Sequence, residues 1–328
     1  MRRGLAVLFL VGASTPAVAD NNDLVLGRLA TRMTDASGNV TSVVGQNREL
    51  RALASQLGVA LAPHLLTPAD TLGFAGFQLT VDYSTTTIDS SASYWRVLQS
   101  STDPNGTGTG SHGADMLSTV GFFVRKGVWF LPVPSMEIGA GATHLVDSRT
   151  WTGQLYTKVA LHEGYHQLPI PSLAVRGAVS RMMNQRELDL TVASVDVTVS
   201  KHIGVGGTWR FDPFAGWNAL LIVPRSEVID PTPNVDPLAP GNDSDLLLNF
   251  VFRDQDNIVR NRFFLGAKLQ YYVFQLTIEA QFALAGSSVD DRTGTNDMCM
   301  ANSTTANCDA KDTAAAQRTL SMSAGFDF

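Results

Sequence analysis

The chain has 328 residues, a net charge of −6, 44% hydrophobic residues and 16% charged residues. An acidic balance without clusters of lysine and arginine argues against a nucleic acid as partner. Ordinary soluble domains carry about 25% charged residues, so the low charge content points to an environment other than water for part of the surface.

The first nineteen residues predict a secretory signal peptide. Arg2 and Arg3 form a positive start, Leu5–Ala13 an apolar run, and Ala17-Val18-Ala19 an A-x-A cleavage site before Asp20. The apolar run is too short for a spanning helix, and no other stretch approaches eighteen consecutive apolar residues. We therefore expect an exported chain without a transmembrane helix.

Residues 20–71 form an N-terminal segment whose place the sequence does not decide. Leu50, Leu53, Ala54 and Leu57 recur at the spacing of one helical face, which predicts a short amphipathic helix within 46–60. Prolines at 63 and 68 end this pattern. The segment could plug a lumen, lie on the periplasmic side of a barrel, or pack against a partner.

From residue 72 onward, apolar and polar residues alternate with a period of two, which is typical of strands with different surroundings on their two faces. The clearest example is 274–284, and the last strand, Gln317–Phe328, alternates in the same way. Within Leu188–Lys201 the apolar residues move from even-numbered to odd-numbered positions, which predicts a β-bulge near Ala193–Ser194. A tight turn is expected at Lys201-His202, and Pro213 should make the following strand irregular.

Ten such strands follow one another, and every second connection is tight. Long polar loops at 84–115, 224–260 and 287–316 alternate with short turns. This rhythm predicts an all-β, antiparallel, up-and-down transmembrane β-barrel over 72–328, with ten strands favoured. Twelve strands are the alternative if parts of 20–71 add a hairpin. A secreted β-sandwich would also alternate, but with shorter strands and charged outward faces.

The signal peptide, the repeated alternation and the terminal Phe328 together resemble Gram-negative outer-membrane β-barrel proteins, as a general class rather than one subfamily. The resemblance covers roughly 72–328. It implies location in the cell outer membrane and contact with outer-membrane lipid and lipopolysaccharide. It also implies that the C-terminal strand, with Phe326 and Phe328, is read by the barrel-assembly machinery.

The polar faces of the predicted strands carry charged residues that would face the lumen. A ten-stranded barrel is narrow, so we expect ion pairs and hydrogen bonds to fill it; a pore lining is the alternative. The lumen-facing charged residues are Asp82, Arg125, Glu137, Lys158, Arg176, Arg210, Arg262, Lys268 and Glu279.

His162-Glu163-Gly164-Tyr165-His166 matches the H-E-x-x-H zinc-protease motif. That chemistry needs a helix, so that both histidines share one face, whereas this stretch ends a period-two segment close to Pro169. Omptin proteases use Asp-His pairs near the outer rim, and this sequence has no Asp-x-His there. His144 lies near the predicted outer end of a strand, but the sequence does not indicate a serine that could act with it in catalysis. We therefore expect no enzyme activity, no metal and no cofactor.

Two further features lie in the loops. Cys299 and Cys308 are the chain's two cysteines, and in an exported protein they predict one loop-closing disulfide. Asp243, Asp245, Asp254 and Asp256 lack the glycine spacing of a calcium loop and predict a solvated face.

The sequence thus predicts a non-enzymatic outer-membrane β-barrel with a structural or surface-interaction role, whose loops contact the outside and could bind an extracellular ligand. A narrow, porin-like small-solute channel gated by the N-terminal segment is the alternative. An outer-membrane hydrolase is a third possibility.

Overall fold

The computed structural model describes residues 20–64, 66–106, 113, 115–128, 135–164, 170–230, 249–290 and 311–328. The predicted signal peptide, the Cys299–Cys308 disulfide, and Asp243 and Asp245 lie outside the described residues. No helix among the described residues is long and apolar enough to cross a membrane.

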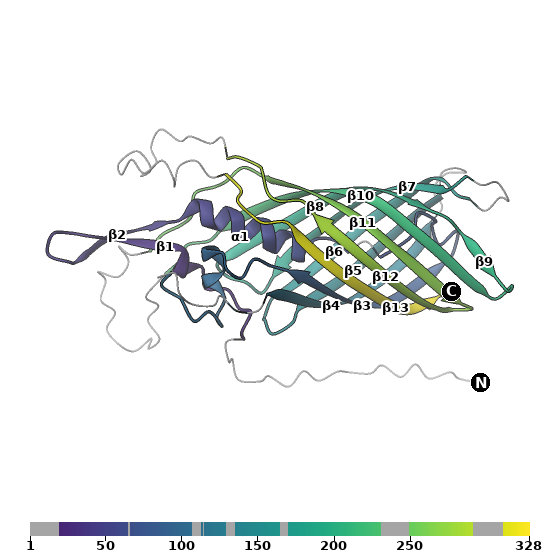
Figure 1. Ribbon diagram of the computed structural model, residues 1–328, viewed down its shortest axis with the longest axis horizontal. Helices are drawn as coiled ribbons and strands as arrows, with labels where there is room; N and C mark the ends of the chain where they lie inside the picture. The colour runs from purple at the N-terminus through teal and green to yellow at the C-terminus, as the bar shows by residue number, and fades with distance from the viewer. Residues whose placement is uncertain are drawn as a thin grey trace, which may run out of the picture.

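Ten antiparallel strands of the described chain close into a barrel (Figure 1). Each strand pairs with its neighbour along the chain, and β13 pairs with β3 to complete the ring. This confirms the predicted antiparallel up-and-down barrel of ten strands. The strands are β3 (Phe77–Thr87), β4 (Met116–Val128), β5 (Ser135–Leu145), β6 (Trp151–His162), β7 (Ser172–Met183), β8 (Leu188–Ser200), β10 (Trp209–Ser226), β11 (Ile258–Tyr271), β12 (Phe274–Ala283) and β13 (Gln317–Asp327).

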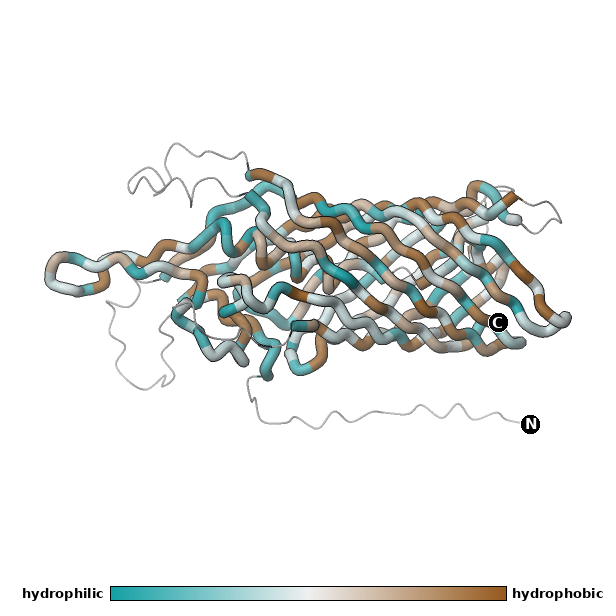
Figure 2. Tube along the Cα trace, in the orientation of Figure 1, coloured by the Kyte–Doolittle hydropathy of each residue, from teal (hydrophilic) through white to brown (hydrophobic). Residues whose placement is uncertain are grey.

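Exposed apolar residues recur along the barrel strands, and Figure 2 shows hydrophobic residues alternating with others along them. In β12, Phe274, Leu276 and Ile278 are 39–58% exposed, whereas Thr277 and Glu279, which alternate with them, are buried inside. An outward belt of this kind suits hydrocarbon, and closure leaves no strand edge with unpaired backbone groups, each of which would cost several kcal/mol in lipid.

The two ends of the barrel differ. The described parts of the connections between β3 and β4, between β10 and β11, and between β12 and β13 lie at one end, which we call the long-loop end. The C-terminus lies at the other, the short-turn end (Figure 1). There the backbone of Phe328 pairs with that of Phe77 through two hydrogen bonds of 2.8 and 2.9 Å, so the chain's last residue continues the β13–β3 pairing.

The N-terminal segment begins at the long-loop end (Figure 1). Its strands β1 and β2 pair only with each other in the described chain, as a hairpin that projects away from the barrel. The twelve-strand alternative is therefore wrong, whereas the expected short helix is confirmed. The elements at this end are η1 (Leu26–Leu29), β1 (Ala30–Thr34), β2 (Val40–Gly45), α1 (Asn47–Ala60) and, from the first long loop, η2 (Ser93–Val97).

The predicted bulge in β8 is wrong. This strand pairs with β7 and β10 without a shift of register through Ala193 and Ser194. Leu188, Leu190 and Val192 point into the barrel, where they are buried in one cluster with residues of α1. The apolar parity changes because the inside of the barrel is itself apolar at the long-loop end.

The turn before β10 also differs from the prediction. A short strand, β9 (Ile203–Val205), continues beyond β8, and the chain reverses after it at Gly206 and Gly207, both with positive φ. Strand β10 then passes Pro213 without interruption. The Pro213 carbonyl accepts a hydrogen bond from Lys201 N at 3.1 Å, so its nitrogen faces the break between β8 and β9, where a strand needs no donor.

Candidate functional site in the barrel lumen

The lumen at the long-loop end is filled by α1. The helix packs against β8, β10, β11 and β13, and its Leu50, Leu53 and Leu57 are buried in the same apolar cluster as inward residues of these strands. The fit is close, because a Cβ at Gly58 would lie 2.7 Å from the Ile222 Cδ1 atom. This apolar contact resembles a core packed inside the barrel rather than a water-filled mouth.

Polar contacts fix α1 to the long loops. Buried Arg51 donates to the Asp256 carbonyl at 2.8 Å and to Ser288 Oγ at 3.0 Å. Ser55 donates to Asp312 at 2.6 Å and accepts from Arg260 at 2.6 Å. Burial raises the pKa of Asp312, and the hydrogen bond from Ser55 opposes that rise. The helix is therefore bound to the loops as well as to the wall.

After α1 the chain continues without regular secondary structure. It runs from Leu61, beside Ser180 of β7, to Leu72, beside Glu137 near the start of β5. We call residues 61–72 the lumen segment; all of them but 65 are described. Backbone groups buried in this way need partners, and side chains of the wall supply them. His64 N donates to Gln154 Oε1 at 3.1 Å, and the His64 carbonyl accepts from Arg176 at 3.2 Å.

Carboxylates and hydroxyls of the wall accept from further backbone N–H groups of the lumen segment. Leu66 N donates to Glu279 at 3.0 Å and Leu72 N to Glu137 at 3.1 Å. Ala69 N donates to Ser200 Oγ at 3.0 Å.

Cations and a hydroxyl of the wall bind the carbonyls of the same segment. Lys158 donates to the Pro68 and Asp70 carbonyls at 3.2 and 2.9 Å. Arg262 donates to the Pro63 carbonyl at 3.3 Å, and Ser180 to the Leu61 carbonyl at 2.9 Å. The wall thus binds an irregular backbone on both its donors and its acceptors.

The same wall residues also pair with one another. Lys158 lies 3.3 Å from Glu137, which accepts a 2.6 Å hydrogen bond from the Tyr156 hydroxyl. Arg176 pairs with Asp196 at 2.8 Å. A buried ion costs several kcal/mol to desolvate unless it is paired and hydrogen-bonded. The ion pairs and the lumen segment together satisfy these charges.

His64 brings a side chain of the lumen segment to the wall. Its Nδ1 lies 4.0 Å from Asp82, and its ring centroid lies 5.4 Å from that of Phe123. Arg125 lies 3.9 Å from the same carboxylate. All of these side chains are buried.

At the short-turn end, Asp70 lies 3.5 Å from Arg210, which pairs with Asp212 at 2.7 Å. Thr71 donates to Glu163 from both its backbone nitrogen and its hydroxyl, at 2.9 and 2.6 Å. A polar cavity of about 100 Å³ remains between the segment and the wall here, with room for several water molecules. The lumen segment is therefore held at both ends of the barrel.

The predicted lumen residues fall into two groups. Arg210 lies at the short-turn end and is partly exposed. The others lie inside the barrel and are at most 5% exposed: Asp82, Arg125, Glu137, Lys158, Arg176, Arg262, Lys268 and Glu279.

Sequence reasoning missed several partners in the lumen. Asp196 lies between two outward valines of β8. A charged residue at that position of the strand could have been recognised as facing the lumen. Tyr156 had a weaker signal, because polar residues at inward positions are common in barrels. Gln154 falls on the polar face of the predicted strand, but its contact with the lumen segment could not be predicted. No signal placed the lumen segment itself, because its two prolines indicate only a break in regular structure.

The stretches considered for enzyme chemistry have other surroundings. His162 ends β6 as a strand residue, and Glu163 accepts hydrogen bonds from Thr71 and Ser135. His144 faces the outer wall, where its ring lies 4.5 Å from that of Trp151. The described residues contain no group of three or more His, Cys, Asp or Glu side chains that could hold a metal.

Comparisons with known proteins add little beyond the fold. No protein-family model and no curated protein matches the sequence. Among solved structures, the trimer form of OmpT, an outer-membrane protein of Vibrio cholerae, is 9% identical, with a TM-score of 0.27 over 65% of this chain and 57% of OmpT. The transport unit of the autotransporter AIDA-I from Escherichia coli is 9% identical, with a TM-score of 0.33 over 86% of this chain and 99% of that unit.

The outer-membrane transporter YddB from Escherichia coli is 8% identical, with a TM-score of 0.24 over 81% of this chain and 39% of YddB. Such distant likenesses assign no function. The fold, a closed antiparallel barrel of ten strands in the described chain, is shown by the strand pairings themselves.

Replacing Arg176 by Met should destabilise the barrel strongly, because Asp196 is left buried without its ion pair and the His64 carbonyl loses a donor. Breaking a buried pair in this way costs about 3–5 kcal/mol. Arg181→Met is the matched control on the same strand, since its pair with Asp189 is exposed and such pairs contribute about 0–1 kcal/mol. Urea unfolding in liposomes measures both changes; equal losses would contradict this account of the lumen.

Proposed function

We propose that this protein is an outer-membrane β-barrel with a non-enzymatic surface-interaction role, whose lumen is closed by its own N-terminal segment. The observation that carries the proposal is the binding of the lumen segment by the wall along its backbone, below a helix packed into the long-loop end. A lumen occupied in this way favours the surface role over solute conduction.

The orientation follows from the two ends of the barrel. In outer-membrane barrels, short turns face the periplasm and longer loops face outward, which places the long-loop end outside. Residues 20–60 lie at that end, and the lumen segment leads from them back to the short-turn end. The N-terminal part of the exported chain is then displayed outside, and the lumen is its route through the wall.

The displayed surface is extended. It comprises the β1–β2 hairpin, η2 and the described parts of the three long loops. The exposed tip of the hairpin is held by Asp35, which accepts hydrogen bonds from the backbone of Ser37 and Asn39 at 2.8 and 2.9 Å. The base of the hairpin packs into the apolar cluster through Val43, whereas its tip is exposed. A two-stranded hairpin is marginally stable in water, so we infer that the tip meets an extracellular ligand or a partner's surface.

Absence of catalysis is part of the same proposal. Glu163 is engaged by Thr71 and Ser135, and His144 by Trp151, so neither residue stands at an open catalytic site. Hydrolysis of peptides or phospholipids by the purified barrel that is lost in His144→Ala would contradict it.

Two epitope insertions test the display of the N-terminal segment. One is placed after Gly38 in the β1–β2 hairpin, and its matched control after Gly206 in the turn before β10. Both glycines have open space where a Cβ would lie, so neither insertion should disturb packing. On intact cells, antibody should bind the hairpin tag and reach the control tag only after the outer membrane is permeabilised. A hairpin tag that also requires permeabilisation would overturn the orientation.

We further propose that Phe326 and Phe328 serve as the recognition signal for the barrel-assembly machinery. The Phe328 side chain is 64% exposed and stacks on Phe326 with ring centroids 6.2 Å apart. Substitution at such a surface position changes stability by about 0.5 kcal/mol or less, so its loss should matter more for recognition than for folding.

Phe328→Ala should therefore lower the amount of folded barrel in the outer membrane several-fold, while refolding of the purified chain into detergent stays close to that of wild type. Phe328→Tyr keeps a terminal aromatic ring and should restore assembly. Heat-modifiable migration on gels measures the folded fraction in each case. Equal losses in cells and in detergent would show a structural role instead.

A further inference from the structure

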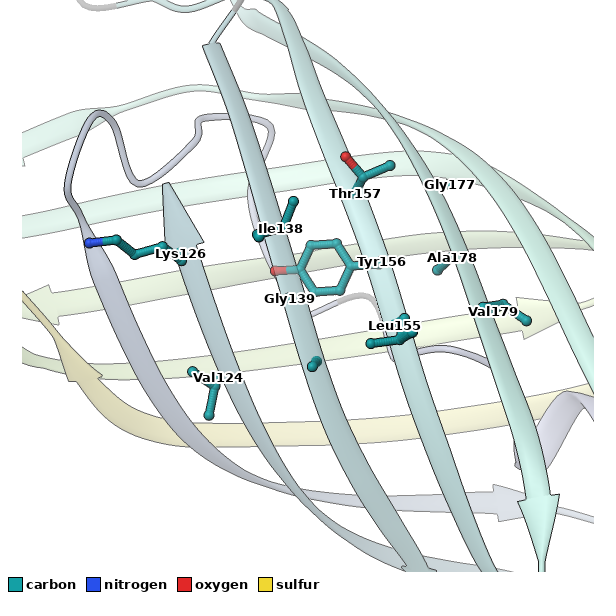
Figure 3. Close-up of a pocket in the computed structure, with 11 residues that line it drawn as sticks. Val124, Lys126, Ile138, Gly139, Leu155, Tyr156, Thr157, Gly177, Ala178 and Val179 are labelled. Atoms are coloured by element: carbon teal, nitrogen blue, oxygen red, sulfur yellow. The ribbon is translucent and has the colours of Figure 1, made fainter. Parts of the chain in front are cut away.

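The outer wall of the barrel contains a groove across β4, β5, β6 and β7 (Figure 3). Its volume is about 520 Å³, within the range of about 300–1,000 Å³ typical of small-molecule sites. The recess exists because two of the outward residues there, Ala140 and Gly177, are small. The apolar side chains beside it belong to Val124, Ile138, Leu155 and Val179.

The groove has a direction given by the strand register. Lys126, Ile138, Thr157 and Gly177 are successive cross-strand partners and form one line across the four strands. Lys126 stands two residues before the end of β4, at the short-turn end, and its ammonium donates to the Ala75 carbonyl at 2.7 Å. The recess therefore carries a cation at the membrane edge and is apolar beyond it.

We propose that this groove binds one anionic phospholipid of the periplasmic leaflet, with an acyl chain in the recess and the phosphate on Lys126. The inference rests on the outer-membrane location proposed above. A lysine ammonium has three donors, and Ala75 takes one of them, which leaves donors for phosphate oxygens. The Thr157 hydroxyl lies on the same line of the wall.

The shape and size of the groove favour a lipid over a second copy of the chain. A recess lets the wall contact an acyl chain on several sides, which adds dispersion contacts that a flat barrel surface lacks. Eleven residues line the groove, whereas a stable protein interface uses about 20–30 residues a side. A single lipid matches both the area and the charge.

The test is native mass spectrometry of the full chain purified in detergent and incubated with dioleoyl phosphatidylglycerol or the zwitterionic phosphatidylcholine. Wild type should retain one phosphatidylglycerol molecule. Gly177→Leu should lower that retention about ten-fold, because the added side chain occupies the recess, where open space surrounds the position that a Cβ would take. Ala280→Leu, on the outward face of β12, is the matched control and should retain the lipid.

Lys126→Gln separates the charge from the recess. It should abolish the preference for phosphatidylglycerol over phosphatidylcholine while leaving the recess open. Equal retention of phosphatidylglycerol by wild type, Gly177→Leu and Lys126→Gln would overturn the site. A dimer mass that disappears in Gly177→Leu would also overturn it, because the groove would then bind a second copy of the chain. Heat-modifiable migration of the same samples shows whether the barrel purified from membranes is folded. A folded barrel that retains no lipid would contradict the lipid site but not the proposed outer-membrane barrel.

Discussion

The hydrogen bonds between the lumen segment and the wall are the interaction on which the rest of the structure depends. An irregular backbone in a narrow lumen must find a partner for every buried donor and acceptor, and Glu137, Lys158, Arg176, Arg262 and Glu279 provide many of them. The same five side chains would be unfavourable in an empty, dry lumen. The wall and the lumen segment therefore stabilise each other.

The lumen has two parts, in which different interactions hold the N-terminal segment. At the long-loop end α1 packs against apolar inward side chains, where burial of hydrocarbon stabilises the contact at about 25 cal/mol per Å². Farther in, ion pairs and backbone hydrogen bonds stabilise the contact between the lumen segment and the wall. In the apolar part the helix lies close to the wall, because Gly58 meets Ile222 without room for a side chain. The polar part sets the path of the chain beyond it.

Much of the wall could be predicted from the sequence, because a strand between lipid and a lumen must alternate. The ten strands, their closure and the buried charges such as Arg125 and Glu279 follow from that alternation alone. The errors arose where the inside is not polar: Leu188, Leu190 and Val192 were assigned to the lipid side because no pattern shows that a helix of the same chain lies within. The lumen segment was equally hidden, since its contacts use backbone atoms that are the same in every residue.

Single-channel conductance in planar bilayers tests most directly whether the N-terminal segment closes the lumen. We expect no open level for a chain of residues 20–328, and a reproducible open level when residues 20–72 are deleted. A deletion of residues 30–45 alone removes the β1–β2 hairpin, keeps α1 and the lumen segment, and should stay closed. A steady open level in the chain of residues 20–328, or a deletion of 20–72 that inserts as a folded barrel and stays closed, would contradict closure by this segment.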